Sequence, residues 1–226
     1  MSGLKPYEIV LMILGIALFS VLLWEVIKKG FTMTYGAGFL LPLAFIGYPS
    51  IKSISFIGEI ETVKEEINNV QVDRNDAEAK ATLEKKLDAV EDRASSPDDL
   101  ATISNGYLAI DNQEKAVEKA NEVLEKEPDN PKALEVKKVV AVEEQIKQVK
   151  ENPNDEAAKQ ALIVQMVALE KIPTQTSNKT VSLANGYFLL NDVIKAKAYV
   201  DSTKIIQPAN LRIKKISETL SRVTPN

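Results

Sequence analysis

The side chains of this chain that could perform chemistry are carboxylates, amines, amides and hydroxyls. The sequence contains no cysteine and no histidine, which removes thiol chemistry, the usual zinc and iron ligands and the commonest general base. Carboxylates occur in runs such as Glu61–Glu66, Asp88–Arg93 and Glu114–Lys126, where opposite charges three or four residues apart are typical of a solvated helix surface. No phosphate-binding loop, nucleophile elbow or calcium loop is found. We therefore expect no enzyme activity, no catalytic residue, no cofactor and no metal site.

The charge of the chain is unevenly distributed. Residues 1–52 contain four lysines and two glutamates, a net charge of +2, so that residues 53–226 carry −6 of the total of −4. An acidic surface repels phosphate groups, and no basic stripe with interleaved aromatic residues offsets this repulsion. We therefore expect no nucleic-acid partner.

The elements that must position these side chains begin with an apolar region, residues 1–52, which we predict to be a membrane anchor. Ile9–Ile27 is a run of about 20 residues with one carboxylate, and a helix of that length crosses about 30 Å of hydrocarbon. Tyr7 and Trp24 lie near its ends, where amphipathic rings favour the headgroup level. A cleaved signal peptide is the alternative, but the run is long for one and no A-x-A cleavage site follows it.

A second apolar stretch, residues 31–48, predicts a second span that returns across the membrane after the turn at 28–30. It contains three glycines and Pro42, which membrane helices tolerate, so a partial or kinked span is the alternative. Lysines are nearly balanced on the two sides, which leaves the orientation open, with a preference for a cytoplasmic soluble part on a bacterial inner membrane. The residues expected at the membrane interface are Tyr7, Trp24, Lys28, Lys29, Tyr48 and Lys52.

The region after Lys52 has apolar residues at helical spacing, and proline-containing pairs divide it into helices. Comparison of this region with itself reveals a period of about 80 residues. The returning residues include Asn75-Asp76 as Asn154-Asp155, Leu83 as Leu162, Asn105-Gly106-Tyr107 as Asn185-Gly186-Tyr187, and Lys115-Ala116 as Lys195-Ala196.

This periodicity predicts an all-α fold in which a two-helix transmembrane hairpin precedes a solenoid built from a duplicated helical unit. The expected divisions are a connector helix over 53–73, a first unit over 74–144 and a second unit over 145–226. A final helix over 211–223 has a polar outer face, as the terminal helix of a solenoid requires for solubility.

Each unit contains a segment, over 97–130 and 177–210, that resembles a tetratricopeptide repeat. The residues that match the spacing of that family's pattern are Leu100, Ile103, Ser104, Tyr107, Ala116, Ala120 and Pro128 in the first segment, and Thr180, Leu183, Ala184, Tyr187, Ala196, Val200 and Pro208 in the second. Ala120 and Val200 replace the large aromatic residue of the pattern, and the helix from Pro131 departs from it at Lys137 and Lys138.

The resemblance implies a curved solenoid whose concave face binds peptides or protein segments. Asn105 and Asn185 would then face that groove beside Tyr107 and Tyr187, at positions where family members use asparagine to hold the ligand backbone. The alternative is that these four residues only pack the helices together.

Two functions follow from this organisation. The first is a membrane-anchored scaffold or adaptor that recruits protein partners, because anchoring raises the effective concentration of both components at one surface. The second is an accessory subunit of a membrane channel, transporter or secretion complex, in which the transmembrane hairpin is the working part; Gly36 and Gly38 would allow close helix contact there. The identity of the partner and homo-oligomerisation are left open.

Overall fold

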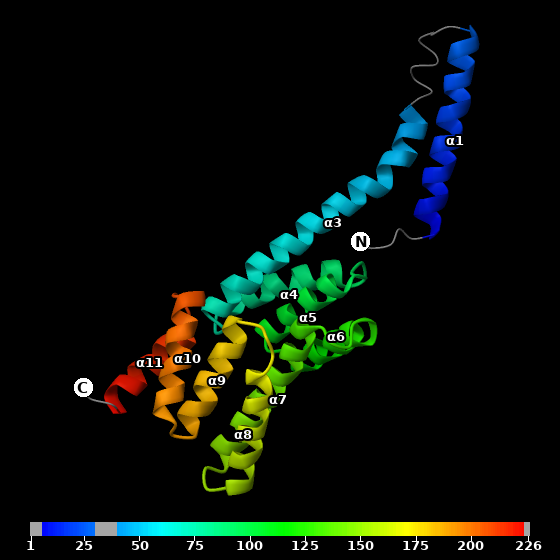
Figure 1. Cartoon of the computed structure of the whole chain (residues 1–226). Coiled ribbons are helices and arrows are strands. Elements are labelled where there is room, and N and C mark those ends of the chain that lie inside the picture. Colours follow the sequence, from blue (N-terminus) through cyan, green and yellow to red (C-terminus); the bar gives the residue numbers. More distant parts are fainter. Residues whose placement is uncertain (1–5, 30–39, 224–226) are drawn as a thin grey trace. The chain divides into compact units, whose positions relative to one another are not determined.

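The computed structural model describes residues 6–29 and 40–223, and all the regular elements in these ranges are α-helices (Figure 1). The predicted all-α class is therefore confirmed for the described residues. The chain divides into two compact units, Met1–Glu61 and Thr62–Asn226.

Unit 1 contains α1 (Pro6–Lys29) and the first part of α3 (Leu40–Val72). Of the described residues, Ile9–Lys28 forms the one helical segment whose length and composition would allow it to cross a membrane, although a signal sequence would share these properties. Gly15 of α1 lies directly against α3: a Cβ atom there would be 2.9 Å from the carbonyl oxygen of Pro42 and 2.9 Å from Cγ1 of Ile46. Only a hydrogen fits at this point, so the two helices are in close contact.

The predicted second span and connector helix differ from the structure. Residues 30–39 lie outside the described residues, and from Leu40 one helix continues to Val72 without a break at 48–53. The apolar spacing explains this continuity, because Phe56, Ile60 and Val63 keep the three- and four-residue intervals of a helix after the last proline. The described residues therefore contain one candidate span in place of the predicted two.

The predicted interface residues are described in part. Tyr7 and Trp24 are exposed on α1, and Nζ of Lys28 lies 4.9 Å from the centroid of the Trp24 ring. Lys29, Tyr48 and Lys52 belong to helices, but their side chains lie outside the described residues.

Unit 2 is an array of helices in which each helix from α4 to α11 packs on the next. α5, α7, α9 and α11 also contact one another in sequence, so they form one row. The bounds are α4 Ala77–Glu91, α5 Pro97–Ala109, α6 Gln113–Lys126, α7 Pro131–Glu151, α8 Glu156–Glu170, α9 Ser177–Leu189, α10 Val193–Ile206 and α11 Leu211–Val223.

The same local turn joins α5 to α6 and α9 to α10. Asp111 (φ 66°) and Asn191 (φ 63°) adopt the left-handed conformation that ends the first helix of each pair, and asparagine and aspartate tolerate it better than other residues. Asn112 and Asp192 follow, and their side-chain oxygens accept hydrogen bonds from the first turn of the next helix. Short-range chemistry thus sets the geometry of both pairs.

Two glycines allow these pairs to approach the preceding helix. At Gly106 of α5 a Cβ atom would lie 2.6 Å from Cδ2 of Leu87 on α4, and at Gly186 of α9 it would lie 2.5 Å from Sδ of Met166 on α8. Both neighbouring side chains are fully buried. Alanine at either position therefore requires the neighbour to move.

The two glycines predict different responses to the same substitution. We expect G106A to lower the free energy of unfolding by about 1–3 kcal/mol, because the branched Leu87 side chain has little freedom in a packed core. G186A should cost less, because the unbranched thioether of Met166 can change rotamer and alanine favours the helix by about 1 kcal/mol over glycine. Denaturant unfolding of the full chain in detergent micelles, followed by circular dichroism, measures both. G58A, in open space on α3, is the control, and equal losses for G106A and G186A would contradict the explanation.

Candidate functional site

The two predicted tyrosines are buried in helix contacts. The Tyr107 side chain is inaccessible to solvent, and its hydroxyl donates to Oε2 of Glu91 at 2.6 Å. Lys115 completes this contact, with Nζ 4.7 Å from the centroid of the Tyr107 ring. Burial, followed by the Glu91 interaction, raises the pKa of Tyr107 to about 12, so the phenol stays protonated. Tyr107 therefore holds α5 to α4 and does not reach a bound partner.

Tyr187 has the equivalent position between α9 and α8. Its hydroxyl donates to Oε1 of Glu170 at 2.7 Å, and Lys195 Nζ lies 4.6 Å from its ring centroid. Tyr199 donates to the same Glu170 oxygen at 2.8 Å and stacks on Tyr187 with a centroid distance of 5.8 Å. Both tyrosines therefore lie outside the predicted groove. The Tyr107 ring is enclosed between α5 and α4, and the Tyr187 ring is enclosed between α9 and α8.

The two predicted asparagines are half-buried, and their surroundings differ. The Asn105 side-chain oxygen accepts a hydrogen bond from Nδ2 of Asn178 at 2.9 Å, while its own amide nitrogen has no acceptor in the described part of the chain. Asn185 lies on the face of α9 that also carries Asn178 and Ser182, because these residues are separated by four and three positions. Asn105 and Asn185 are thus not equivalent in their contacts.

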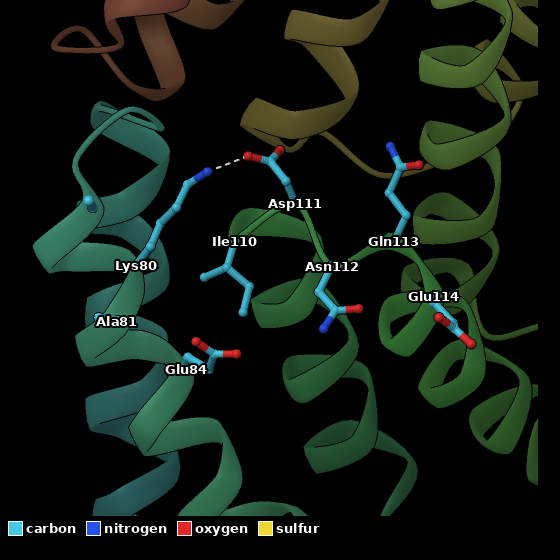
Figure 2. Close-up of a pocket in the computed structure, with 9 residues that line it drawn as sticks. Lys80, Ala81, Glu84, Ile110, Asp111, Asn112, Gln113 and Glu114 are labelled. Atoms are coloured by element: carbon cyan, nitrogen blue, oxygen red, sulfur yellow. Dashed lines mark hydrogen bonds and ion pairs between the residues drawn. The ribbon is translucent and has the colours of Figure 1, made fainter.

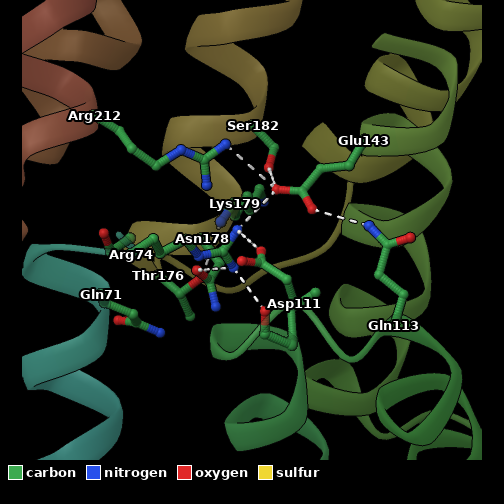
Figure 3. Close-up of polar contacts among 12 residues, drawn as sticks. Gln71, Arg74, Asp111, Gln113, Glu143, Thr176, Asn178, Lys179, Ser182 and Arg212 are labelled. Atoms are coloured by element: carbon green, nitrogen blue, oxygen red, sulfur yellow. Dashed lines mark hydrogen bonds and ion pairs between the residues drawn. The ribbon is translucent and has the colours of Figure 1, made fainter. Parts of the chain in front are cut away.

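A cluster of polar residues centred on Arg74 joins α5, α6, α7, α9 and α11 of unit 2 (Figure 3). Arg74, which follows α3, is only 8% exposed. Its Nη2 donates to the carbonyl oxygen of Leu108 at 2.9 Å and to Oδ1 of Asn178 at 3.3 Å. Its Nη1 lies 3.3 Å from Oδ1 of Asp111 and 3.4 Å from Oε1 of Glu143. We call this group the Arg74 cluster.

Glu143 of α7 contacts the remaining members of the cluster. Ser182 Oγ donates to its Oε1 at 3.2 Å, and Gln113 Nε2 donates to its Oε2 at 3.4 Å. Nη2 of Arg212, on α11, lies 3.6 Å from the same Oε1. Burial, with the nearby charge of Arg74, lowers the pKa of Arg212, but a guanidinium stays charged at ordinary pH. Two arginines therefore share one carboxylate.

Two cavities lie beside the cluster and share three of their lining residues. One has a volume of about 250 Å³ and the other about 470 Å³. Asn68, Asn105 and Thr176 line both, so the cavities adjoin, and we call them together the Asn105 groove. The smaller cavity is mainly apolar, with walls that include Ile67 and Val136.

The end of α3 forms one wall of this groove and is fixed by buried amides. Nδ2 of Asn210 donates to the carbonyl oxygen of Gln71 at 3.0 Å, and Nε2 of Gln207 donates to that of Asn68 at 3.1 Å. Asn210 is 3% exposed. The bond to Gln71 satisfies a carbonyl in the last turn of α3, where carbonyls lack intrahelical partners. Together the two bonds dock the end of α3 onto the α10–α11 connection.

Glu135 of α7 also lines the groove and is almost completely buried. Its Oε1 accepts a hydrogen bond from the hydroxyl of Thr176, whereas its Oε2 has no hydrogen-bond partner among the residues that the structure describes. Burial raises the pKa of Glu135 above its ordinary value, against the opposing effect of Thr176 and of the positive charge on Lys179. The Lys179 ammonium instead donates to the carbonyl oxygens of Glu170, Ile172 and Thr174.

A separate open hollow of about 630 Å³ lies between α4 and the α5–α6 turn (Figure 2). Figure 2 shows the ion pair of Lys80 with Asp111 at one side, and Glu84 and Glu114 also line the hollow. Its charged side chains face water, and among the described residues no group of three or more carboxylates is placed to hold a metal ion.

Sequence reasoning named Asn105 as a candidate but did not name Arg74, Glu143, Asn178 or Arg212. These side chains carry no local pattern, since the partners of Arg74 lie 34, 69 and 104 residues away along the chain. What these side chains can do chemically is orient amides and donate or accept hydrogen bonds. The groove is therefore suited to binding.

Comparison with known proteins gives no match: no family model, no curated protein and no solved structure is similar to this chain.

The Arg74 cluster predicts a large loss of stability when its central charge is removed. We expect R74M to lower the free energy of unfolding by about 3–5 kcal/mol, because it leaves buried acceptors without their donor. The control is K132M, which removes an exposed ion pair with Asp98 and should cost less than about 1 kcal/mol. Denaturant unfolding of the full chain in micelles measures both. A loss for R74M no larger than that for K132M would show that the cluster is not a stabilising centre.

The raised pKa of Glu135 predicts a pH-dependent effect of E135Q. The folded chain holds this proton more tightly than the unfolded chain, so the contribution of Glu135 to stability is largest below pH 4.5 and is lost as pH rises through the raised pKa. Glutamine keeps an acceptor for Thr176 without the charge. We therefore expect the melting temperature of E135Q, relative to that of the unchanged chain, to rise between pH 4 and pH 7.5. E118Q, at an exposed position, should show no such trend.

Proposed function

We propose that this chain is a membrane-anchored adaptor that binds a segment of another protein in the Asn105 groove. The observation that carries the proposal is the pair of adjoining cavities that share Asn68, Asn105 and Thr176. The candidate span in α1 supports the anchor. The lining of the groove favours a protein ligand, because amides can bond to an extended backbone while small apolar pockets accept side chains.

The chemistry of the groove suggests the kind of segment that it accepts. The amide nitrogen of Asn105 can donate to a carbonyl oxygen of the ligand. The smaller cavity, next to Ile67 and Val136, has room for one apolar side chain. We therefore propose an extended segment that contains one apolar residue beside a backbone carbonyl that the Asn105 amide can bind.

The repeated architecture supports an origin by duplication and the resemblance to tetratricopeptide repeats. α4 and α8 have 15 residues each, α5 and α9 have 13 each, and α6 and α10 have 14 each. Both α5–α6 and α9–α10 use the same left-handed turn. We propose that unit 2 is a short solenoid whose inner row is α5, α7, α9 and α11, with α11 as its cap.

Membrane anchoring would allow the groove to bind its partner even with low affinity. Two components held at one membrane meet at a raised effective concentration, so that a short segment can bind productively. The close contact of α1 and α3 at Gly15 supports a hairpin anchor. A bacterial inner membrane and a cytoplasmic unit 2 remain our predictions for the location.

The same contact favours a second candidate function, an accessory subunit of a membrane complex whose apolar helices are the working part. Small residues allow membrane helices to pack closely, as Gly15 does within unit 1. Replacement of the anchor by an unrelated two-span anchor separates the two functions. Retained partner capture by unit 2 supports the adaptor, and its loss supports the accessory subunit.

The adaptor function predicts site-specific capture in native membranes. A photo-crosslinking amino acid at Thr102, which lines the smaller cavity, should form an adduct with one protein, whereas the same group at exposed Glu118 on α6 should not. Filling the cavity with A101W should then reduce the Thr102 adduct at least about tenfold, as loss of a buried contact worth about 1.4 kcal/mol would. Equal adducts at Thr102 and Glu118, or an adduct that A101W leaves unchanged, would contradict binding in the groove.

A further inference from the structure

The outer face of α8 carries an exposed apolar stripe. Ile163, Val164 and Val167 are 39%, 55% and 39% exposed, respectively. The residues stand at positions that share one face of a helix. The opposite face of α8 packs into the core of unit 2, where Leu162 and Met166 are buried. The stripe is therefore additional to the apolar surface that the fold of unit 2 requires.

The corresponding face of α4 is charged. Leu83 corresponds to Leu162, and both are fully buried, so the two helices are oriented alike. In this alignment Ile163, Val164 and Val167 take the places of Glu84, Lys85 and Asp88, which are all exposed. A solvated position on this helix does not need an apolar residue. The apolar stripe on α8 consequently indicates a surface that a partner covers.

The charges around the stripe identify what covers it. Glu156 begins α8; it also lies 2.7 Å from Nζ of Lys159 on the same helix, and 82% of its side chain is exposed. Lys171 follows the last residue of α8 in helical conformation, with φ −68° and ψ −16°. Helical spacing places both on the same face as Val164 and Val167. An antiparallel copy of α8, related by a two-fold axis between Ile163 and Val164, sets each Glu156 beside Lys171 of the second copy.

The same two-fold arrangement pairs the apolar residues. Ile163 of one copy faces Val164 of the second copy, and Gln160 faces Val167 at the edge of the stripe. The apolar stripe thus covers itself, and its two ends carry opposite charges that meet across the axis. Such self-complementarity is what an isologous dimer interface requires. The corresponding ends of the α4 face carry Ala77 and Asp92, which provide no such pair.

We propose that two copies of this chain associate through antiparallel α8 helices. The interface from Glu156 to Lys171 covers about four turns of one helix and buries less than the roughly 1,200 Å² of a stable interface in solution. The strength of the dimer therefore rests on the proposed membrane anchoring, whereas the position of its interface on α8 does not. Confinement to a membrane supplies the effective concentration that such a small interface needs. The surface is distinct from the Asn105 groove.

Cysteine crosslinking of the full chain in native membranes tests the proposal directly. The chain contains no cysteine, so V164C introduces a single thiol beside the predicted two-fold axis. Oxidation should convert V164C into a disulfide-linked homodimer. K85C, at the corresponding exposed position on α4, should stay monomeric. No V164C dimer, or equal crosslinking of the two variants, overturns the proposal.

A charge exchange distinguishes a second copy from a different protein. In the V164C background, E156K or K171E places like charges together at both ends of the interface, and we expect the crosslinked fraction to fall roughly fivefold, as for loss of exposed ion pairs. The double variant E156K/K171E restores opposite charges across the axis and should restore the dimer. Failure of the double variant to recover, or a V164C adduct with another protein, would falsify the antiparallel dimer. Because the Thr102 adduct reports on the groove separately, loss of the dimer and loss of partner binding can be told apart.

Discussion

The arrangement of unit 2 depends on the burial of one guanidinium group. Arg74 is 8% exposed, and its partners come from the end of α5, the turn after it, α7 and α9. A buried charge without a partner costs several kcal/mol, far more than the loss of an exposed ion pair. A displacement of any one of these helices would leave Arg74 or Glu143 unsatisfied. The cluster thus couples the position of each helix to that of the others.

The Asn105 groove inherits its geometry from this cluster. Asn178 accepts from Arg74 through its oxygen and donates to Asn105 through its nitrogen. The orientation of the Asn105 amide is therefore set by buried charges, and its nitrogen, which has no acceptor among the described residues, lies at the groove. On the other wall, Asn210 holds the end of α3 through a backbone carbonyl. Each wall is held in place by hydrogen bonds within the protein, which lowers the ordering cost of binding a segment between them.

Corresponding helices of unit 2 carry similar residues at buried positions and different residues at exposed positions. Leu83 and Leu162 are equally buried, whereas exposed Lys85 corresponds to exposed Val164. Asn105 and Asn185 illustrate the same division, since only Asn105 has a partner, Asn178, across the row of helices. Close packing in the interior tolerates little change in side-chain volume, so the residues at buried positions are similar. The exposed positions that differ are those that carry the proposed dimer surface on α8.

The sequence by itself determined the helices of unit 2 and the turns between them, because their signals are local. Apolar residues at helical spacing, Pro97 and Pro131 at helix starts and Asn112 as a cap act within a few residues of themselves. Only the tertiary structure decided which side chains form the site. Tyr107 matches the spacing of the repeat pattern, but only the packing shows that it is enclosed against α4. Arg74 has no recognisable pattern yet is buried among partners from several helices. Partners as far as 104 residues apart are brought together by the packing of whole helices, and no short-range signal encodes that packing.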